Sequence, residues 1–160
     1  ARVAAGMVSV PDDRGLFPSL TVAEHLRLVG SSVDEAAGVF PALAGLAARR
    51  AGACSGGEQQ QLAVALGIVR RPKVLCIDEL SMGLAARVVV ELLSGLRALA
   101  DEGDTAVLVV EQFVDAVLAV ADRGVVLGGG RVIRDEPSEQ LLADRAALEA
   151  AYLGSAPRRR

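Results

Sequence analysis

The sequence is poor in aromatic residues and has no excess of positive charge. Phe, Trp and Tyr make up 2% of its 160 residues, and tryptophan is absent. Proteins that bind nucleic acid by stacking bases need aromatic platforms, so this composition argues against that class. With 17 Lys and Arg against 20 Asp and Glu, the formal net charge is −3, and we expect no broad basic surface for DNA or RNA. Hydrophobic residues reach 52%, which predicts a folded domain with an aliphatic core.

Cysteines and long hydrophobic runs are also scarce. The two cysteines, Cys54 and Cys76, form no C-x-x-C pair and no metal-binding cluster with histidine. We interpret them as reduced thiols. No apolar run reaches the ~18–20 residues of a membrane-spanning helix, because the most apolar segment, 105–120, is interrupted by Glu111, Gln112 and Asp115.

The sequence pattern alternates short apolar runs with helical segments. Strands are expected at three apolar runs and in a glycine-linked hairpin: 4–10, 74–77, 106–110, 124–127 and 131–134. Helices are expected after the capping box of Thr21 and Glu24, and over 32–40, 58–70, 86–100, 113–120 and 138–152. This order predicts an α/β fold with a mostly parallel sheet.

Two of these elements carry sharper expectations. The strand 74–77 is uniformly apolar, which predicts a central strand that is buried on both faces. The helix 58–70 is expected to bury one stripe, formed by Leu62, Ala65, Leu66 and Val69.

Acidic and amide side chains follow three of the predicted strands. Asp78 and Glu79 follow 74–77, Glu111 and Gln112 follow 106–110, and Asp12 follows the first strand. Ligands of open α/β sheets bind at the carboxyl ends of the strands, so this convergence indicates a site. One carboxylate at such a position can hold Mg²⁺ and its neighbour can orient or deprotonate water. The alternative is a plain strand end, because many strands end in an acid before a turn.

The run Ser55-Gly56-Gly57-Glu58 opens the helix 58–70. Two glycines let the backbone approach an anion closely, and the free N–H groups of a helix start favour phosphate. An ordinary serine N-cap with an acid in the first turn explains the same residues.

The order of these motifs carries a family resemblance. SGGEQQ is followed by a helix ending in RRP and then by VLCIDE, with Asp78 lying 21 positions after Gly57. The chain resembles an ABC-type ATPase, most closely the ATP-binding subunit of branched-chain amino-acid importers. Further resembling segments are GMVSVP, LFPSLTVAEHL, MGLA, VEQ, ADRG and AYLG. The expected fold is therefore the mostly parallel, P-loop NTPase-like sheet with a helical insert, as part of an ABC nucleotide-binding domain.

The resemblance implies a role for each matching position. Glu79 matches the catalytic base and Gln112 the switch position, while Asp78 matches the Walker B acid near Mg²⁺ and Asp12 falls at the Q-loop position. The signature loop, which contacts ATP held by the opposite subunit, matches Ser55, Gly56, Gly57 and Glu58. The D-loop at the dimer interface matches Ser81, Met82 and Gly83.

The resemblance also implies ligands and partners. These are ATP and Mg²⁺, a second ABC ATPase subunit and transmembrane permease subunits, with no nucleic acid. The expected location is cytoplasmic, peripheral on the inner face of the cell membrane. Residues 15–28 correspond to the region that touches the permease, and we expect His25 to be exposed or to face a partner rather than to catalyse.

The sequence contains no G-x-x-x-x-G-K-[ST] motif, the loop that cradles the phosphates of ATP. We therefore expect 1–154 to be the C-terminal portion of an ABC ATPase domain, with a helical subdomain at about 20–71 and a frayed basic tail at 155–160. By itself the chain should bind ATP poorly and hydrolyse little. Two departures from the family pattern are apolar: Cys54 replaces a Leu and Leu80 replaces a Pro.

Three functional hypotheses remain open. The first is the motor subunit of an importer. The second is a non-catalytic remnant that supplies only the signature loop or a permease contact. The third, a chromosome-maintenance ATPase, predicts long coiled coils and a basic surface, and the sequence shows neither.

Overall fold

A computed structural model describes residues 5–146 and 148 of the chain. The chain divides into two compact units, one up to Gln112 and one from Phe113 onward. Within the described residues, no helix is long and apolar enough to cross a membrane. The predicted tail 155–160 and the AYLG segment lie outside the described residues.

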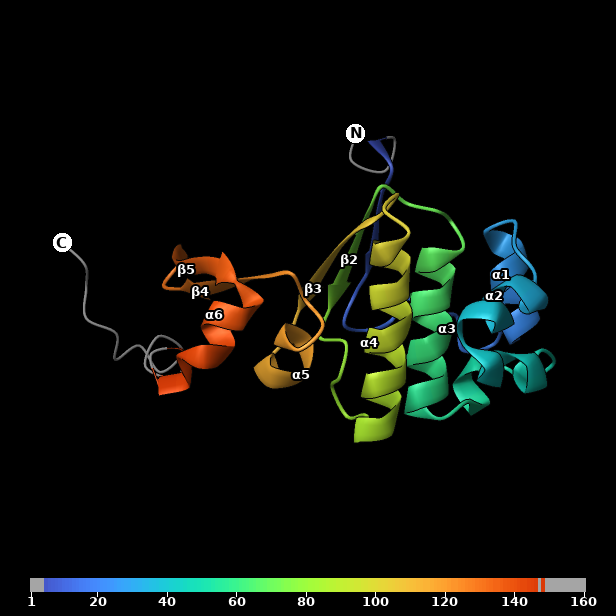
Figure 1. Ribbon diagram of the computed structural model, residues 1–160. Helices are drawn as coiled ribbons and strands as arrows, with labels where there is room; N and C mark the ends of the chain where they lie inside the picture. The colour runs from blue at the N-terminus through green and yellow to red at the C-terminus, as the bar shows by residue number, and fades with distance from the viewer. Residues whose placement is uncertain (1–4, 147, 149–160) are drawn as a thin grey trace. The chain divides into compact units, whose positions relative to one another are not determined.

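The first unit is built on a parallel sheet, as the sequence predicts (Figure 1). Its strands are β1 (Met7–Val10), β2 (Val74–Asp78) and β3 (Ala106–Val110), and β2 lies in the middle. In the register, Val10 pairs with Ile77, and Asp78 pairs with Val110. The carboxyl ends of the three strands therefore meet at one edge.

Only one face of this sheet is well covered. Leu75 and Ile77 are fully buried beneath the helices, whereas Cys76 between them is half-buried. On the neighbouring strand, Leu108 is 56% and Val110 54% exposed. The prediction that 74–77 is buried on both faces is thus wrong, because the described helices pack against a single face. The uniformly apolar strand leaves an apolar sheet face open.

The helix α3 (Gly56–Ile68) is the centre of the first unit. It packs on β1 and β2, with α4 (Ala86–Asp101) on one side and α1 (Val22–Leu28) and α2 (Val33–Val39) on the other (Figure 1). A single buried stripe was the wrong prediction for α3, because neighbours surround it and even Gln60 and Gln61 are buried.

A close approach at Gly67 lets α3 lie directly on the sheet. A side chain there would place its Cβ 2.8 Å from Leu75 Cδ1 and 3.2 Å from Val10 Cγ2. Such a distance is shorter than van der Waals contact, so glycine keeps the helix at this height above the strands.

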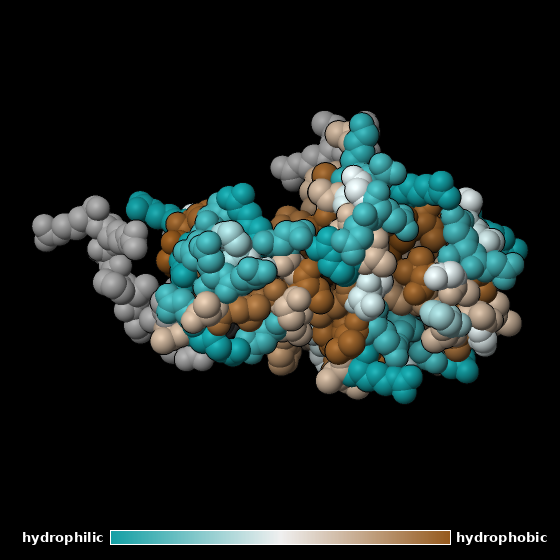
Figure 2. Space-filling view, in the orientation of Figure 1, coloured by the Kyte–Doolittle hydropathy of each residue, from teal (hydrophilic) through white to brown (hydrophobic). Residues whose placement is uncertain are grey.

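Hydrophobic residues also reach the surface around α4 (Figure 2), where Val90 is 63% exposed.

Short helices fill the region between β1 and α3. They are α1 (Val22–Leu28), α2 (Val33–Val39) and the 3₁₀ turns Pro41–Leu46 and Ala51–Ala53. The predicted capping box at Thr21 is present, with Glu24 N–H donating to Thr21 Oγ1. Backbone bonds then join the two ends of this region: Ala51 N–H donates to Leu20 O at 2.8 Å.

The second unit contains the predicted hairpin and three buried leucines. The hairpin pairs β4 (Arg123–Gly128) with β5 (Arg131–Pro137) in antiparallel fashion. It is followed by α6 (Ser138–Ala143) and preceded by α5 (Val114–Leu118). The core of this unit is formed by Leu118, Leu141 and Leu148.

Burial of α3 on all sides leads to a testable prediction. Leu62 and Val64 point to opposite sides of the helix, and both are fully buried. We expect Leu62→Ala to lower the free energy of unfolding by about 2–5 kcal/mol, and Val64→Ala by about 1.5 kcal/mol. Leu28→Ala is the matched control, because Leu28 is 65% exposed on α1. Urea denaturation followed by circular dichroism measures all three, and a silent Val64→Ala would contradict the all-round burial.

Candidate functional site

The polar residues that follow β2 and β3 come together, as the sequence predicts. Gln112 Nε2 donates a hydrogen bond to Glu79 Oε1 at 3.1 Å. Glu79 N–H donates to Val110 O at 3.0 Å, which continues the pairing of the two strands by one residue. The carboxylate of Glu79 is therefore held by a neutral amide at the carboxyl edge of the sheet.

The backbone of Glu79 is in an unusual conformation. Its φ is 48°, in the left-handed region that side-chain-bearing residues rarely adopt. Such conformations persist where the surrounding structure enforces them, and they are frequent in functional sites. Here the strained residue directly follows β2, the middle strand of the sheet, and carries the carboxylate that Gln112 contacts.

Glu111 connects this edge to the next loop. Its Oε1 accepts a hydrogen bond from Ser81 N–H, and its Oε2 accepts one from Gln112 N–H at 2.9 Å. Sequence reasoning placed Glu111 at the edge but assigned it no role of its own. Its place directly before Gln112, at the end of a predicted strand, was the available signal.

The segment 81–83 leaves the edge as a tight turn. Ser81 is buried, and its hydroxyl oxygen has no hydrogen-bond partner among the described residues. Met82 is 55% exposed, and Gly83 takes a φ of 72°. The turn therefore presents a large apolar side chain to the outside, which fits the interface role that the sequence assigns to this segment.

Asp12 follows β1 and lies in an exposed loop. Its Oδ1 accepts a hydrogen bond from Asp13 N–H at 2.9 Å. Asp78, at the end of β2, is also exposed. Across residues 5–146 and 148, no three His, Cys, Asp or Glu side chains form a metal-binding group. Exposed carboxylates suit a hard cation such as Mg²⁺, which is commonly held by one or two carboxylates together with phosphate oxygens and water.

The start of α3 is a complete capping box. Ser55 N–H donates to Glu58 Oε2 at 2.7 Å, and Glu58 N–H donates to Ser55 Oγ at 3.3 Å. The Ser55 backbone bond is the main cause that lowers the pKa of Glu58, and Arg49, 3.3 Å away, adds to it. Both side chains thus serve the helix, and the simple N-cap explanation accounts for their contacts.

The two glycines of this motif differ in their surroundings. A Cβ at Gly57 would lie 3.2 Å from Val88 Cγ2, so helix packing by itself favours glycine there. At Gly56 the nearest atoms, Arg14 Nη2 and Leu84 Cδ2, are 3.7 and 3.9 Å from the ideal Cβ position, which is ordinary van der Waals contact. Packing therefore requires glycine at Gly57 more strongly than at Gly56.

Arg14 is a residue that sequence reasoning left without a role. Its Nε donates to Gln60 Oε1 at 2.9 Å and its Nη1 to Gln59 Oε1 at 2.8 Å. A basic residue in a Pro- and Gly-containing loop after a strand was the only signal in the sequence. Its partners lie more than forty positions away, so no local pattern could have named them.

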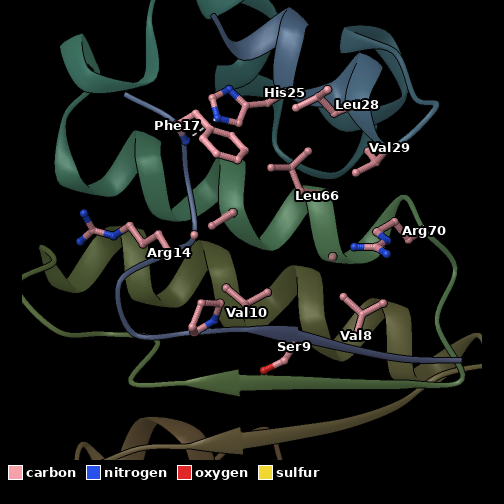
Figure 3. A pocket seen from close by; sticks show the side chains of 14 residues that line it. Val8, Ser9, Val10, Arg14, Phe17, His25, Leu28, Val29, Leu66 and Arg70 are labelled. Carbon is pink, nitrogen blue, oxygen red and sulfur yellow. Dashed lines mark hydrogen bonds between the residues drawn. The ribbon is translucent and has the colours of Figure 1, made fainter. Parts of the chain in front are cut away.

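A cavity of about 260 Å³ lies between β1, α1 and α3. Arg14 and Arg70 stand at its two ends, with Leu66 between them (Figure 3). Phe17 and His25 form part of the wall and stack with ring centroids 6.0 Å apart.

The expectation for His25 was wrong, because its side chain is buried. Nε2 accepts a hydrogen bond from Phe17 N–H at 2.9 Å, and Nδ1 lies 2.9 Å from Thr21 O. Both ring nitrogens are satisfied when the imidazole is neutral and carries its proton on Nδ1. His25 therefore shapes the cavity wall through Phe17, which is itself 58% exposed.

The two departures from the family pattern are both buried. Leu80 is fully inaccessible, and Cys54 is 8% exposed. Burial is the main cause that raises the pKa of the Cys54 thiol, and the nearby carboxylate of Glu58 adds to it. A buried thiol with a raised pKa is unreactive, which agrees with a packing role for Cys54.

The capping box generates a prediction on pH. A lowered carboxyl pKa contributes stability at neutral pH, which is lost as pH falls through the folded-state value. Gln at this position can keep both capping bonds but cannot titrate. We therefore expect Glu58→Gln to reduce the loss of stability below about pH 4.3, measured by thermal unfolding between pH 3 and pH 7. Glu58→Ala, the control, loses the bond to Ser55 N–H and should destabilise the fold by about 1 kcal/mol at neutral pH. An acid-induced loss that is equal in Glu58→Gln and the wild type would contradict this account.

Comparison with known proteins identifies the family of this chain. The family model described as ABC transporter matches residues 1–82. The branched-chain amino acid transport ATP-binding proteins BraG of Pseudomonas aeruginosa and LivF of Archaeoglobus fulgidus are 36% and 32% identical over 154 and 150 residues. These matches include 91% and 88% of this chain, and the chain spans 65% and 64% of the length of these relatives.

Other relatives have other cargo in their names, and a solved structure shares the fold. The aliphatic sulfonates import ATP-binding protein SsuB 2 of Rhizobium johnstonii is 39% identical over 128 residues, which is 77% of this chain and 51% of that protein. The solved structure of an ATP binding subunit of an ABC transporter superimposes with a TM-score of 0.75 at 21% identity, covering 94% of this chain and 68% of that one. This likeness shows the P-loop NTPase-like fold predicted from the sequence. Because the family model matches more than half of the 160 residues, the chain belongs to the ABC transporter family.

Proposed function

We propose that this chain belongs to the ATP-hydrolysing motor subunit of an ABC importer, with branched-chain amino acids as the cargo. The observation that carries the proposal is the contact of Glu79 with Gln112 at the carboxyl edge of the sheet. A carboxylate that is oriented by a neutral amide at this edge can act on a water molecule bound beside it.

The residues at the edge have separate proposed roles. Bound ATP and Mg²⁺ would supply the phosphoryl group and its charge neutralisation. Asp78, with Asp12 from the neighbouring strand end, would provide carboxylate oxygens for the cation. Glu79 would orient and deprotonate the attacking water, and the Gln112 amide would fix Glu79 and hydrogen-bond to water or phosphate.

The start of α3 is proposed to act on a nucleotide held by a second subunit. Ser55, Gly56 and Gly57 lie at a helix N-terminus, where N–H groups and the helix dipole favour phosphate. Glu58 keeps this start in shape through its bond to Ser55 N–H. In such a pair of subunits the turn Ser81–Met82–Gly83 would lie across the interface.

Transmembrane permease subunits are the second proposed partner. The cavity wall around Phe17 falls within the segment that resembles the permease-contacting region of the family. Its apolar lining and exposed Phe17 suit a protein contact. With this partner the chain would sit on the cytoplasmic face of the cell membrane.

The assignment of the cargo is based on sequence similarity and not on the geometry of the site. BraG and LivF support branched-chain amino acids, whereas SsuB 2 carries another cargo in its name. Uptake of labelled leucine by cells that depend on the transporter containing this chain tests the assignment, with an alkanesulfonate as the competing cargo.

A second candidate is a non-catalytic subunit that supplies only the signature loop or a permease contact. The observation in its favour is that these 160 residues contain no G-x-x-x-x-G-K-[ST] motif. Binding of ATP with Mg²⁺, compared between this chain and a version extended by its upstream coding sequence, separates the candidates. Binding only by the extended version supports the motor subunit, and binding by neither supports the second candidate.

The catalytic proposal predicts the effect of one substitution. In the transporter assembled with this chain, Glu79→Gln should lower kcat for ATP hydrolysis by about 10²–10⁴-fold, while the affinity for ATP changes little. Glu102→Gln is the matched control, because Glu102 is exposed at the end of α4.

The same assay distinguishes the two candidates. If this chain is non-catalytic, Glu79→Gln should leave ATP hydrolysis by the assembled transporter unchanged. Ser55→Arg should still lower that rate, because the larger side chain would block the proposed phosphate-binding position. An unchanged rate in Glu79→Gln would therefore overturn the assignment of Glu79 as the base.

A further inference from the structure

Arg14 connects two regions that are distant in the sequence. Its guanidinium reaches from the loop after β1 to the first turns of α3, where it donates to Gln59 Oε1 at 2.8 Å and to Gln60 Oε1 at 2.9 Å. The residue is held in the left-handed region with a φ of 67°. Two bonds enforce this turn: Arg14 N–H donates to Pro11 O, and Gly15 N–H donates to Asp13 Oδ1.

The hydrogen bonds continue from Arg14 to the residue before Ser55. Gln59 Nε2 donates to Cys54 O at 3.2 Å and to Ala51 O at 2.9 Å. Gln60 is 3% exposed, so the oxygen that accepts from Arg14 is shielded from water. The path therefore ends on the backbone that leads into Ser55 and Gly56.

Arg14 also belongs to the wall of the cavity (Figure 3). It lines the cavity together with Gly15 and Phe17 of the same loop. Phe17 is in turn fixed to α1 through His25. A change in the position of this loop would thus move the guanidinium that holds the start of α3.

The hydrogen bonds from the Arg14 guanidinium to Gln59 and Gln60 are of a kind that can break and re-form when the loop moves. Among the described residues, no carboxylate forms an ion pair with Arg14, and its partners are two neutral amides. Bonds to neutral acceptors are weaker than those to carboxylates. The fork geometry of the guanidinium nevertheless lets one side chain bridge two amide oxygens, which a lysine ammonium cannot reproduce.

We propose that Arg14 is a positioning residue that couples the cavity to the start of α3. What occupies the cavity would displace the loop, and Arg14 would pass this displacement to Ser55–Gly57. The inference rests on the proposed function in one respect, namely that the start of α3 faces a nucleotide. The coupling itself is a property of the chain and can be measured without nucleotide.

A double-mutant cycle tests the coupling. The amide resonances of Gly56 and Gly57 are recorded by NMR in the wild type, Phe17→Ala, Arg14→Gln and the double variant. We expect Phe17→Ala to shift both resonances in the wild type and to leave them unshifted when Arg14 is replaced. A purely structural role for Arg14 would leave the effect of Phe17→Ala the same in both backgrounds.

Hydrogen exchange provides a second readout on the same samples. Loss of the two bonds should speed exchange of the backbone amides at 59–61 by about tenfold. Arg14→Lys keeps the charge and replaces Arg14→Gln in the experiment if the latter does not fold. It is also expected to uncouple the cavity from the start of α3, because it lacks the guanidinium fork. Arg70→Gln is the matched control, because Arg70 lines the opposite end of the cavity and is exposed.

The outcomes separate this inference from the proposed function. Equal shifts with and without Arg14, or no shift in the wild type, would overturn the coupling and leave the ATPase assignment untouched. A normal rate in Glu79→Gln would overturn the catalytic assignment and leave the coupling standing.

Discussion

The parallel pairing of β2 with both of its neighbours is the constraint on which the candidate site depends. Asp78 pairs with Val110, and the chain continues this pairing through Glu79 N–H and Val110 O. Because parallel strands end at the same edge, residues that are 33 positions apart come within hydrogen-bond distance. The left-handed backbone of Glu79 then turns the chain out of the sheet at the point where its carboxylate meets Gln112.

The second organising element is α3, most of which is buried after its first turn. Its last turn lies directly on the sheet at Gly67, and its start is shaped by the Ser55 and Glu58 capping box. A helix in this position connects whatever its N-terminus contacts with the packing of the whole first unit. Arg14 adds a hydrogen-bonded link from the start of the helix to the wall of the cavity.

The aliphatic composition has a structural meaning that differs between the two faces of the sheet. On the helix-covered face, Leu75 and Ile77 are fully buried. On the other face, Leu108 and Val110 remain largely exposed although they belong to a uniformly apolar strand. Removal of such apolar surface from water is energetically favourable. The apolar pattern of a strand thus indicates which side chains can be buried, but it does not tell which of them the described residues shield from solvent.

The sequence by itself determined the elements whose causes are local. Capping boxes at Thr21 and Ser55, the apolar strands and the glycine turn of the hairpin depend on residues a few positions apart, and all are present. The family and the convergence of acids at one edge also followed from motif order. Tertiary structure decided the rest: the burial of His25 and of most of α3 after Gln59, the open sheet face, and the two amides that Arg14 contacts. These features depend on which distant segments become neighbours, and the pattern of a single segment does not contain that information.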